Sequence, residues 1–528
     1  MASLWTWLAA FALLYQLRRF INIFIALRTM KGLPTRYVLF SPVCIAGAII
    51  PISTRWYPRL IEAWHKRDTR YAEFKSEAFC MIPLVYGPPS VHMAAPEVTK
   101  TILSDMMAWP KPDIAVTLNE LGDNVLTARG DEWRVHRRTV TPAFSTETHI
   151  DVWEVTRSLY YQMLETEEWR SGDHHFFKNI ADFTTRLALL VIAACGFNMR
   201  LEWNEEGSSD GLTSPIDRAV VTVSSTIVQR LNFAWVYKLP FESLRKVDCA
   251  WSDLHLWLTR EVRTKKAELN NIMKLSGGDK SQYERNVFGQ LISASIENKD
   301  FSDPDVVGNL FIFFFAGHET TAWTLANTMA LLALNPGEQE ELYNNIHSVI
   351  GDREPAHTDY NDLAPVLWAF YEALRLYPTV HLMLRMPAED TVVSDPHFVA
   401  SGKDIVIPKG TITVVDLIGM SRHPRLFPDA EAFKPSRWSS ASEASKTAWD
   451  YFFGFSTGPR VCVGKRFATF EAVCFLTLIL RDWKIDVKLN AGETKEAWKE
   501  RVMQPDLLAT MRMVGDVPLL FTRRSAKA

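Results

Sequence analysis

The longest helical pattern in the sequence covers residues 302–335 and is apolar on every side through its middle. Ser302 is a typical N-cap residue, and Asp305 follows three positions later as its capping-box partner. No helix breaker occurs before Pro336, so the helix would have about 33 residues and a length of roughly 50 Å. Because Leu310–Phe315 is apolar all round, the helix needs a large core around it. The pattern therefore predicts a large, mainly helical body.

The middle of this helix carries small and polar residues that a buried helix does not need for packing. Gly317 weakens the helix, and a buried Glu319 requires a partner or a shifted pKa. Thr320 and Thr321 follow directly. Two interpretations stay open from these residues alone. Either the threonines bond back to the helix carbonyls while Gly317 permits a close helix crossing, or the group serves a function.

Composition excludes several classes of protein. Of the 528 residues, 47% are hydrophobic and 23% are charged, which excludes a disordered chain. The formal net charge of −3 lacks the basic excess that a bulk nucleic-acid binder requires, so no nucleic-acid partner is expected. The cysteines are widely spaced without a Cys-x-x-Cys pair, which excludes a disulfide framework and a zinc ribbon. They are Cys44, Cys80, Cys195, Cys249, Cys462 and Cys474.

The amino terminus predicts a membrane anchor over residues 1–30. Leu4–Leu17 is almost entirely apolar, and a second apolar run, Phe20–Leu27, follows Arg18 and Arg19. A signal-peptide core and an interfacial segment compete with this interpretation, because fourteen residues fall short of the ~20 needed to span hydrocarbon. The basic residues follow the apolar run, so the positive-inside rule keeps the main body in the cytosol.

A second apolar stretch, Tyr37–Ile52, contains two prolines and predicts a surface-embedded patch, with a buried core segment as the alternative. Residues 31–52 would then form an apolar, membrane-proximal linker. Residues 53–528 contain no long linker and predict one catalytic domain.

Short strands interrupt the helical pattern in two regions. β-branched or alternating residues flanked by Pro and Gly predict them, and a helix is predicted from Pro96. The predicted strands are Met81–Tyr86, Val91–Ala94, Thr391–Val393, Asp404–Ile407 and Thr411–Val415. The expected fold class is mainly α with a small β subdomain.

A turn-rich loop before an apolar helix brings together residues suited to holding a metal-bound flat ligand. Cys462 lies just before the helix, where the helix dipole and backbone N–H groups stabilise a thiolate. Gly458 and Gly464 would allow the backbone to approach such a ligand, and Arg460 offers a cation for a carboxylate. Phe455 precedes them.

These five residues match the haem-binding signature Phe-x-x-Gly-x-Arg-x-Cys-x-Gly, and the chain from about Ser53 onward resembles the cytochrome P450 superfamily. A phosphate-binding P-loop is excluded, since the two glycines are six positions apart and Arg466 follows Lys465 where Ser or Thr is required. A zincin helix at His318-Glu319 is excluded as well, because Ala322 stands where the second His is required.

Further segments of the family occur in the expected order. The segment Ala316–Thr321 resembles the oxygen-activating part of the long central helix that lies over the haem. Glu372 and Arg375 resemble the Glu-x-x-Arg pair, and Phe433–Trp438 resembles the loop that carries its arginine partner, Arg437. Trp133, Arg137 and Arg385 are similar to the family's contacts with the haem propionates.

The resemblance implies a haem-thiolate monooxygenase that binds haem b (iron protoporphyrin IX) and uses O2. Cys462 would be the axial iron ligand and the metal-binding residue, with Phe455, Gly458, Arg460 and Gly464 as neighbouring cofactor contacts. Thr320 and Glu319 would be the catalytic pair that delivers protons. Glu372, Arg375 and Arg437 would be structural.

No Gly-x-Gly-x-x-Gly fingerprint for a flavin or dinucleotide occurs, so electrons from NADPH would arrive through another protein. The resemblance implies NADPH–cytochrome P450 reductase as the donor, with cytochrome b5 as a second candidate. A basic patch would steer the acidic donor. It comprises Arg134, Arg137, Arg138, Lys434, Lys465 and Arg466.

Family analogy also implies a pocket for a hydrophobic small molecule, reached through membrane lipid. The style of the motifs resembles fungal members that oxidise terpenoids, polyketides, lipids or aromatic compounds, as in secondary metabolism. Location in the endoplasmic reticulum membrane is expected. Two other functions stay open: a haem-thiolate isomerase or dehydratase that needs no external electrons, and a non-enzymatic haem-binding protein. The implied pocket stretches are Asp105–Asn124, Val220–Val236, Asn309–Ala316, Thr379–Leu384 and Pro505–Ala509.

Overall fold

The chain forms two compact units, each assembled from separate segments of the sequence. A computed structural model describes residues 2–44, 53–113, 119–166, 169, 172–197, 199, 203, 218–219, 222–223, 226, 230, 234–275, 286–395, 398, 404–439, 443–507 and 510–524. The first unit, called the sheet unit, comprises Met1–Pro112, His381–Ala430 and Ser456–Arg460. The second, called the helical unit, comprises Asp113–Val380, Glu431–Phe455 and Val461–Ala528.

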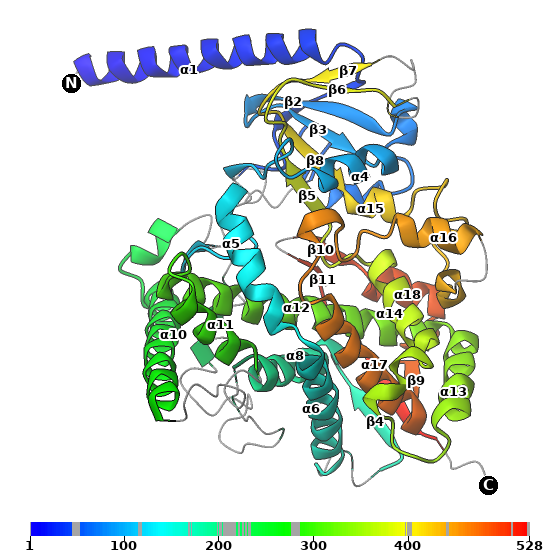
Figure 1. Ribbon diagram of the computed structural model, residues 1–528. Helices are drawn as coiled ribbons and strands as arrows, with labels where there is room; N and C mark the ends of the chain where they lie inside the picture. The colour runs from blue at the N-terminus through cyan, green and yellow to red at the C-terminus, as the bar shows by residue number, and fades with distance from the viewer. Residues whose placement is uncertain are drawn as a thin grey trace. The chain divides into compact units, whose positions relative to one another are not determined.

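The sheet unit is organised around a five-stranded mixed sheet with the strand order β1-β2-β3-β8-β5 (Figure 1). Strands β6 and β7 form a separate antiparallel pair. Its elements are α1 (Ala2–Thr29), β1 (Thr35–Phe40), α3 (Glu62–His65), η1 (Ala72–Phe74), β2 (Ala78–Tyr86), β3 (Ser90–Met93), α4 (Pro96–Ser104), β5 (Leu382–Arg385), β6 (Thr391–Val393), β7 (Ile405–Ile407), β8 (Ile412–Asp416), α15 (Leu417–Ser421) and η7 (Gly458–Arg460).

The five strands predicted from the sequence are all present. Strand β6 has the predicted bounds, and the other four differ by one to three residues at an end. Helix α4 begins at Pro96 as predicted. β-branched and apolar residues between Pro and Gly punctuation were thus a sufficient signal for β2, β3, β6, β7 and β8, whereas β1 and β5 of the five-stranded sheet were not predicted as strands.

The predicted surface-embedded patch over residues 37–52 is wrong for its first part. Residues 35–40 form β1, which pairs in parallel with β2. Val38 is fully buried against Phe79 and Met81, while Tyr37 and Leu39 on the opposite face are exposed. The alternation of a half-buried strand explains this burial pattern. Residues 45–52 lie outside the described residues.

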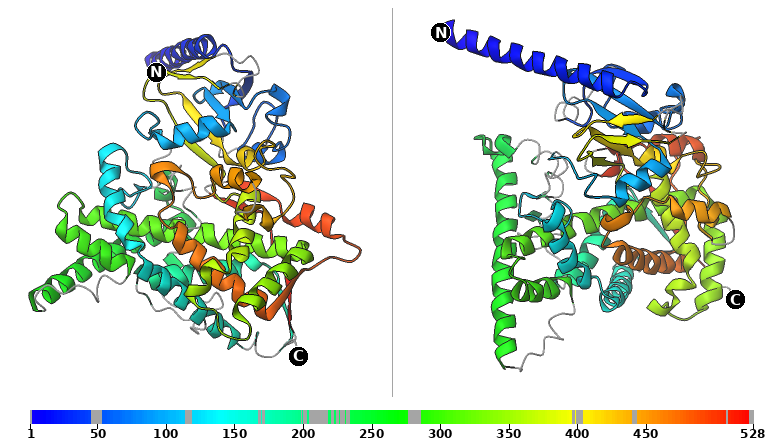
Figure 2. Two further views of the ribbon diagram at one scale, coloured as in Figure 1. Left: turned by 45° about the vertical axis from the view of Figure 1, so that its right-hand side comes forward. Right: turned by 45° about the horizontal axis from the view of Figure 1, so that its top comes forward.

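The helical unit surrounds one long helix, α12, which contacts α8, α10, α14, α17 and β9 (Figure 1). Figure 2 shows α10 as a long straight helix of the same unit. Its elements are α5 (Gly130–Val140), η3 (Thr141–Ala143), α6 (Thr146–Leu164), β4 (His174–Phe177), α8 (Ile180–Phe197), η4 (Ala234–Lys238), α10 (Glu242–Leu275), α11 (Val287–Glu297), α12 (Asp303–Leu334), α13 (Pro336–Ile350), η5 (His357–Asn361), α14 (Ala364–Leu376), η6 (Pro435–Trp438), α16 (Glu443–Asp450), α17 (Lys465–Asp482), β9 (Trp483–Val487), α18 (Lys495–Val502), β10 (Pro505–Leu507), β11 (Met511–Met513) and β12 (Leu519–Arg523).

Helix α12 confirms the prediction made from its sequence pattern. It has 32 residues, and its start is fixed by Asp305, whose Oδ2 accepts hydrogen bonds from the Ser302 backbone N–H at 2.7 Å and from the Ser302 hydroxyl at 2.6 Å. Leu310–Phe313 and Phe315 are buried. The core expected around this helix is therefore present.

Two small sheets of the helical unit were not predicted. Strand β12 pairs antiparallel with both β4 and β9, and β10 and β11 form a hairpin. These strands have three to five residues each. Segments this short carry too few residues to show a period of two.

The two apolar helices differ in burial. Helix α1 is one continuous helix through Arg18 and Arg19 (Figure 2). It exposes large apolar side chains, Phe11 and Phe20 among them. Among the described residues, the helix whose length and hydropathy would suit a membrane span is α8. Because 72% of α8 is buried within the protein, it is a core helix of the helical unit.

Close backbone packing at Gly308 leads to the first prediction. A Cβ at Gly308 would lie 2.4 Å from the Asp123 carbonyl oxygen and 2.6 Å from the Gly122 carbonyl carbon. We expect Gly308→Ala to lower the free energy of unfolding by about 1–3 kcal/mol, because backbone atoms must shift. Thermal unfolding followed by circular dichroism measures this change.

Gly337→Ala is the matched control. Gly337 lies in the first turn of α13, and a Cβ there meets nothing within 4 Å. Removing a helical glycine without a clash should be neutral or stabilising by up to about 1 kcal/mol. Equal losses in the two variants would show that the close packing at Gly308 is not the cause.

Candidate active site

The thiol of Cys462 is enclosed by protein without being packed against it. Cys462 precedes α17 by three residues, and its own backbone N–H donates to the Phe455 carbonyl at 2.9 Å. The side chain counts as exposed by surface area. Nevertheless, desolvation by the surrounding protein is the largest influence and raises the pKa of the thiol, while the Gly464 backbone N–H opposes it. The sulfur is thus accessible, while the surrounding protein partly desolvates it.

Two cations act on this sulfur and favour its thiolate form. Arg137 on α5 donates from Nη1 to the Val461 carbonyl at 2.9 Å, and its charge lowers the pKa of Cys462. Lys465 acts in the same direction. Its Nζ lies 5.8 Å from the centre of the Tyr371 ring and 5.9 Å from that of Phe455. Bound to an iron cation, the thiolate would gain far more than burial costs it.

Trp133 lies one helical turn before Arg137 on the same face of α5 and is buried. Of the two, Arg137 contacts the segment before α17 through the Val461 carbonyl. Their predicted role as contacts of the haem propionates stays a prediction.

Glycine occupies positions 458 and 464 of the loop for different structural reasons. Gly458 has a φ of +68°, and a Cβ there would lie 2.6 Å from the Leu103 carbonyl oxygen at the end of α4. Backbone conformation and packing within the sheet unit therefore require this glycine. At Gly464 a Cβ would meet the Phe144 ring at 3.8 Å, an ordinary contact. Nothing in the described protein demands glycine at position 464, whereas close approach of a bound group would.

Three of the predicted cofactor contacts belong to the sheet unit. Gly458 and half-buried Arg460 lie in η7, and Arg385 lies at the end of β5. Burial lowers the pKa of Arg385 to about 10, and no carboxylate of the described residues acts on it. Its Nη1 donates to the Leu384 carbonyl. Arg385 is therefore a buried cation without a counter-charge among these residues.

The threonines of α12 bond back to the helix. Thr320 Oγ1 donates to the Ala316 carbonyl at 2.8 Å, and Thr321 Oγ1 donates to the Gly317 carbonyl at 2.9 Å. A Cβ at Gly317 would lie 3.3 Å from Ile192 of α8, so the helices cross closely there. The packing interpretation of these residues is thus confirmed, and it leaves the functional one possible because a back-bonded hydroxyl can rotate.

Glu319 is the residue of this group that packing does not explain. Its Oε1 accepts a hydrogen bond from Thr510 Oγ1 at 2.9 Å, while its buried Oε2 has no hydrogen-bond partner in the described part of the chain. Burial raises the pKa of this carboxyl, with Thr510 and the charge of Arg512 opposing. Thr510 was missed from the sequence, since no pattern links positions 191 residues apart.

Glu372 is the centre of a fully buried charge network. Its two oxygens accept hydrogen bonds from Arg375 Nη2 at 2.8 Å and Nε at 2.9 Å, and from Arg437 Nε at 3.2 Å. The Lys434 backbone N–H and Trp438 Nε1 complete it at 3.1 and 3.0 Å. The predicted association of Glu372, Arg375 and Arg437 is confirmed.

The residues present fit a haem group. In the helical unit the fit rests on the accessible, cation-flanked thiol of Cys462 and the unfilled position at Gly464. In the sheet unit, considered by itself, buried Arg385 carries the charge that suits a propionate. Parts of the predicted pocket cannot be compared. Residues 114–118, most of 220–236 and residues 508–509 lie outside the described residues.

Comparison with known proteins points to one family. A family model described as Cytochrome P450 matches residues 61–512. Cytochrome P450 monooxygenase 124 of Postia placenta is 32% identical over 480 residues, which cover 88% of this chain and 89% of that protein. Cytochrome P450 4F5 of Rattus norvegicus is 28% identical, with coverage of 76% and 73%. Cytochrome P450 4F8 of Homo sapiens is 28% identical, with coverage of 76% and 77%.

The buried network leads to the second prediction. We expect Glu372→Ala to lower the free energy of unfolding by about 3–5 kcal/mol, because Arg375 would keep a buried, unpaired charge. Chemical denaturation measures this loss. Glu242→Ala is the control, since Glu242 pairs with Lys246 on the surface of α10. An exposed pair contributes little, so the control should unfold like the wild type. A Glu372→Ala variant as stable as the control would contradict the assigned role.

Proposed function

The chain belongs to the cytochrome P450 family of monooxygenases, and we propose that it is a haem-thiolate enzyme that inserts one oxygen atom of O2 into a hydrophobic small molecule. The balanced reaction is RH + O2 + NADPH + H⁺ → ROH + H2O + NADP⁺. The observation that supports this proposal best is the accessible thiol of Cys462, with the Gly464 N–H, Arg137 and Lys465 all favouring its thiolate. When bound, the haem would supply the activation of O2.

The proposed cofactor site divides its tasks among charged and apolar side chains. Cys462 would ligate the iron, and Gly464 would leave room beside it. Arg137 and Arg385, together with Arg460 and the Trp133 indole N–H, would hold the two propionates. Phe455 would shield the sulfur and fix the Cys462 backbone N–H through its own carbonyl.

Thr320 and Glu319 would supply protons to the reacting oxygen. The Thr320 hydroxyl would rotate away from the Ala316 carbonyl to donate a hydrogen bond into the site. Glu319 would carry protons from solvent to this position. Burial raises the pKa of its carboxyl, which favours the protonated form that a proton donor needs.

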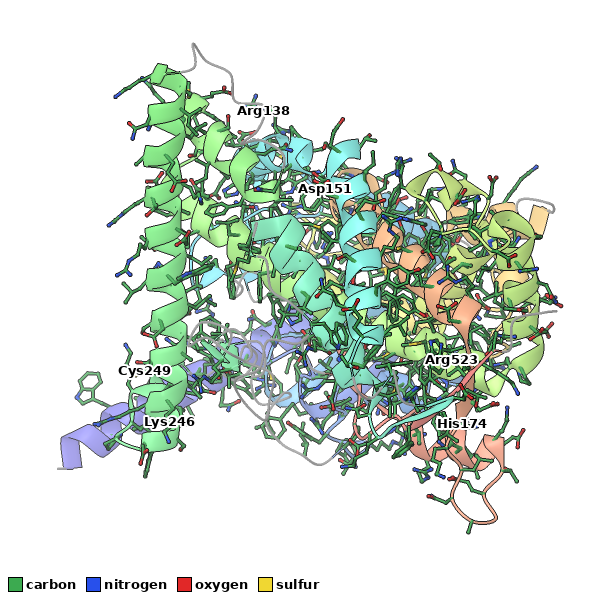
Figure 3. All side chains as sticks on the ribbon, turned by 90° about the horizontal axis from the view of Figure 1, so that it is seen from below. Arg138, Asp151, His174, Lys246, Cys249 and Arg523 are labelled. Carbon is green, nitrogen blue, oxygen red and sulfur yellow. The ribbon has the colours of Figure 1, made fainter. Side chains whose placement is uncertain are left out.

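Electrons would come from NADPH through NADPH–cytochrome P450 reductase, with cytochrome b5 as a second candidate. Exposed arginines of the helical unit support an electrostatic docking surface, Arg134, Arg138 and Arg466 among them. Figure 3 labels Arg138. Lys465 contributes less to this surface than predicted, because its ammonium lies over the Tyr371 and Phe455 rings.

The amino-terminal segment would attach the enzyme to a membrane. Helix α1 has 28 residues, about 42 Å, which exceeds the ~30 Å of a hydrocarbon core. Its exposed apolar side chains support insertion into lipid. We propose residues 1–30 as the anchor, residues 53–528 as the catalytic domain in the cytosol and the endoplasmic reticulum as the membrane. We propose a lipid-soluble terpenoid, polyketide, fatty or aromatic substrate, because an enzyme attached to a membrane would receive its substrate from the lipid.

The third prediction tests the thiolate. With haem added during expression, the reduced wild-type protein plus carbon monoxide should show the absorption band of a thiolate-ligated haem, and Cys462→Ala should lose it. Cys249→Ala is the control, because Cys249 is an exposed cysteine of α10 (Figure 3). A colourless wild type, or a band that survives in Cys462→Ala, would refute the proposed site.

The fourth prediction tests the docking surface. At low ionic strength Arg466→Glu should slow reduction of the haem by the reductase several-fold. A charge at the edge of a docking surface mainly sets the rate at which the two proteins associate. High salt should bring the variant and the wild type together. Arg260→Glu reverses an exposed arginine of α10 and should have no effect. Stopped-flow reduction under carbon monoxide measures the rate, and equal rates at low salt would exclude this surface.

A further inference from the structure

The carboxyl group of Glu319 is held from a separate part of the helical unit, the β10–β11 hairpin. The Thr510 hydroxyl reaches across 191 positions of sequence to donate to Glu319 Oε1 at 2.9 Å. Thr510 directly precedes β11 and is itself buried. The carboxyl therefore has a hydrogen-bond partner outside helix α12.

The hairpin that carries Thr510 is fixed by backbone hydrogen bonds on both sides. The Met511 N–H donates to the Thr379 carbonyl at 2.8 Å, and the Val514 N–H donates to the Gln504 carbonyl at 2.9 Å. Leu507 pairs with Met511 within the hairpin. Its position is thus tied to the segment after α14.

No neighbouring group of α12 performs this task. The Thr320 hydroxyl is engaged with the Ala316 carbonyl, and the His318 Nδ1 lies 2.7 Å from the Phe314 carbonyl oxygen. Of the described charged groups, Arg512 on β11 is the one that acts on the carboxyl, and it does so without a hydrogen bond. Thr510 alone orients Oε1 among the described residues, while Oε2 stays buried and unpartnered.

We propose that Thr510 is a positioning residue that fixes Glu319 through Oε1 and leaves Oε2 as the oxygen that accepts and releases the proton. This inference rests on the proposed function for its relevance to turnover. A proton taken up at Oε2 leaves again from the same oxygen, so the carboxyl is unchanged after each transfer. The hairpin thus becomes part of the proton pathway without touching the reacting atoms.

The fifth prediction is that Thr510→Val raises the pKa of Glu319 by about one unit. The valine keeps the shape of threonine but removes the hydrogen bond that favours the charged carboxylate, while burial continues to favour the neutral acid. Thr510→Ser keeps a hydroxyl and should restore the wild-type value. Infrared titration of the protein follows the carboxyl C=O band, which Glu319→Gln assigns by removing it.

A second readout uses the oxygen chemistry without a known substrate. In reconstituted enzyme supplied with reductase, NADPH and O2 alone, the fraction of NADPH that yields hydrogen peroxide should rise several-fold in Thr510→Val and return in Thr510→Ser. Thr328→Val is the control, because Thr328 is a buried threonine of α12 that bonds to the Thr324 carbonyl. Thr510→Ala replaces the valine variant if that variant does not take up haem.

The outcomes separate the inference from the proposed function. The inference is overturned if the Glu319 carboxyl titrates in Thr510→Val as it does in the wild type, or if Thr328→Val shifts the infrared titration equally. The absorption band with carbon monoxide would remain in both cases. If the wild type lacks that band, the proposed function fails, while the infrared titration still decides whether Thr510 holds Glu319. A shift confined to Thr510→Val, with recovery in Thr510→Ser, supports the assignment.

Discussion

Burial of α12 is the constraint on which the helical unit depends. Thirty-two residues with apolar side chains on every face leave no surface for water, so helices and a strand must cover all sides. Helices α8, α10, α14 and α17 and strand β9 do so. Once this cover exists, any polar group on α12 loses its solvent and must bond within the protein. Thr320 and Thr321 do this by bonding to their own helix, and Glu319 does it through Thr510.

The buried charges separate structural groups from candidate functional ones. In the helical unit Glu372 meets Arg375 and Arg437 with nearly every hydrogen-bonding position used. In the sheet unit Arg70 and Asp416 form an equivalent buried pair at 2.6 Å. Such pairs hold segments in register. Arg385 and the Oε2 atom of Glu319 are the contrasting cases, because each is buried without such compensation among the described residues. Uncompensated burial is costly, and it is tolerated where a ligand or a reaction uses the group.

The sequence predicted features that are decided by residues close together in the chain, and it missed features that depend on distant residues. The start of α12 followed from Ser302 and Asp305, and strands β2, β3 and β8 of the five-stranded sheet followed from short β-branched or apolar runs, because neighbouring residues decide both. Strand β1 was mistaken for a surface patch, since its apolar side chains also suit lipid. The loop around Cys462 was found through its residue pattern, but Gly458 is explained by packing against Leu103.

Contacts between distant segments could not have been predicted from the residues alone; the one between Glu372 and Arg437 was expected only from the family resemblance. Nothing in the sequence pairs Glu319 with Thr510, because the distance between them along the chain carries no periodic signal. The same holds for strand β4, which is too short to be recognised and whose partners come much later in the chain.

Strand β4 also constrains how the protein is made. His174 in β4 meets Thr522 in β12, 348 positions later. At about 5–20 residues per second, the ribosome needs on the order of 20–70 s to synthesise the intervening chain. During that time the edge of β4 has no β12 to pair with and offers open backbone groups to other nascent chains. The strand order therefore delays completion of this sheet until almost the whole chain has been synthesised.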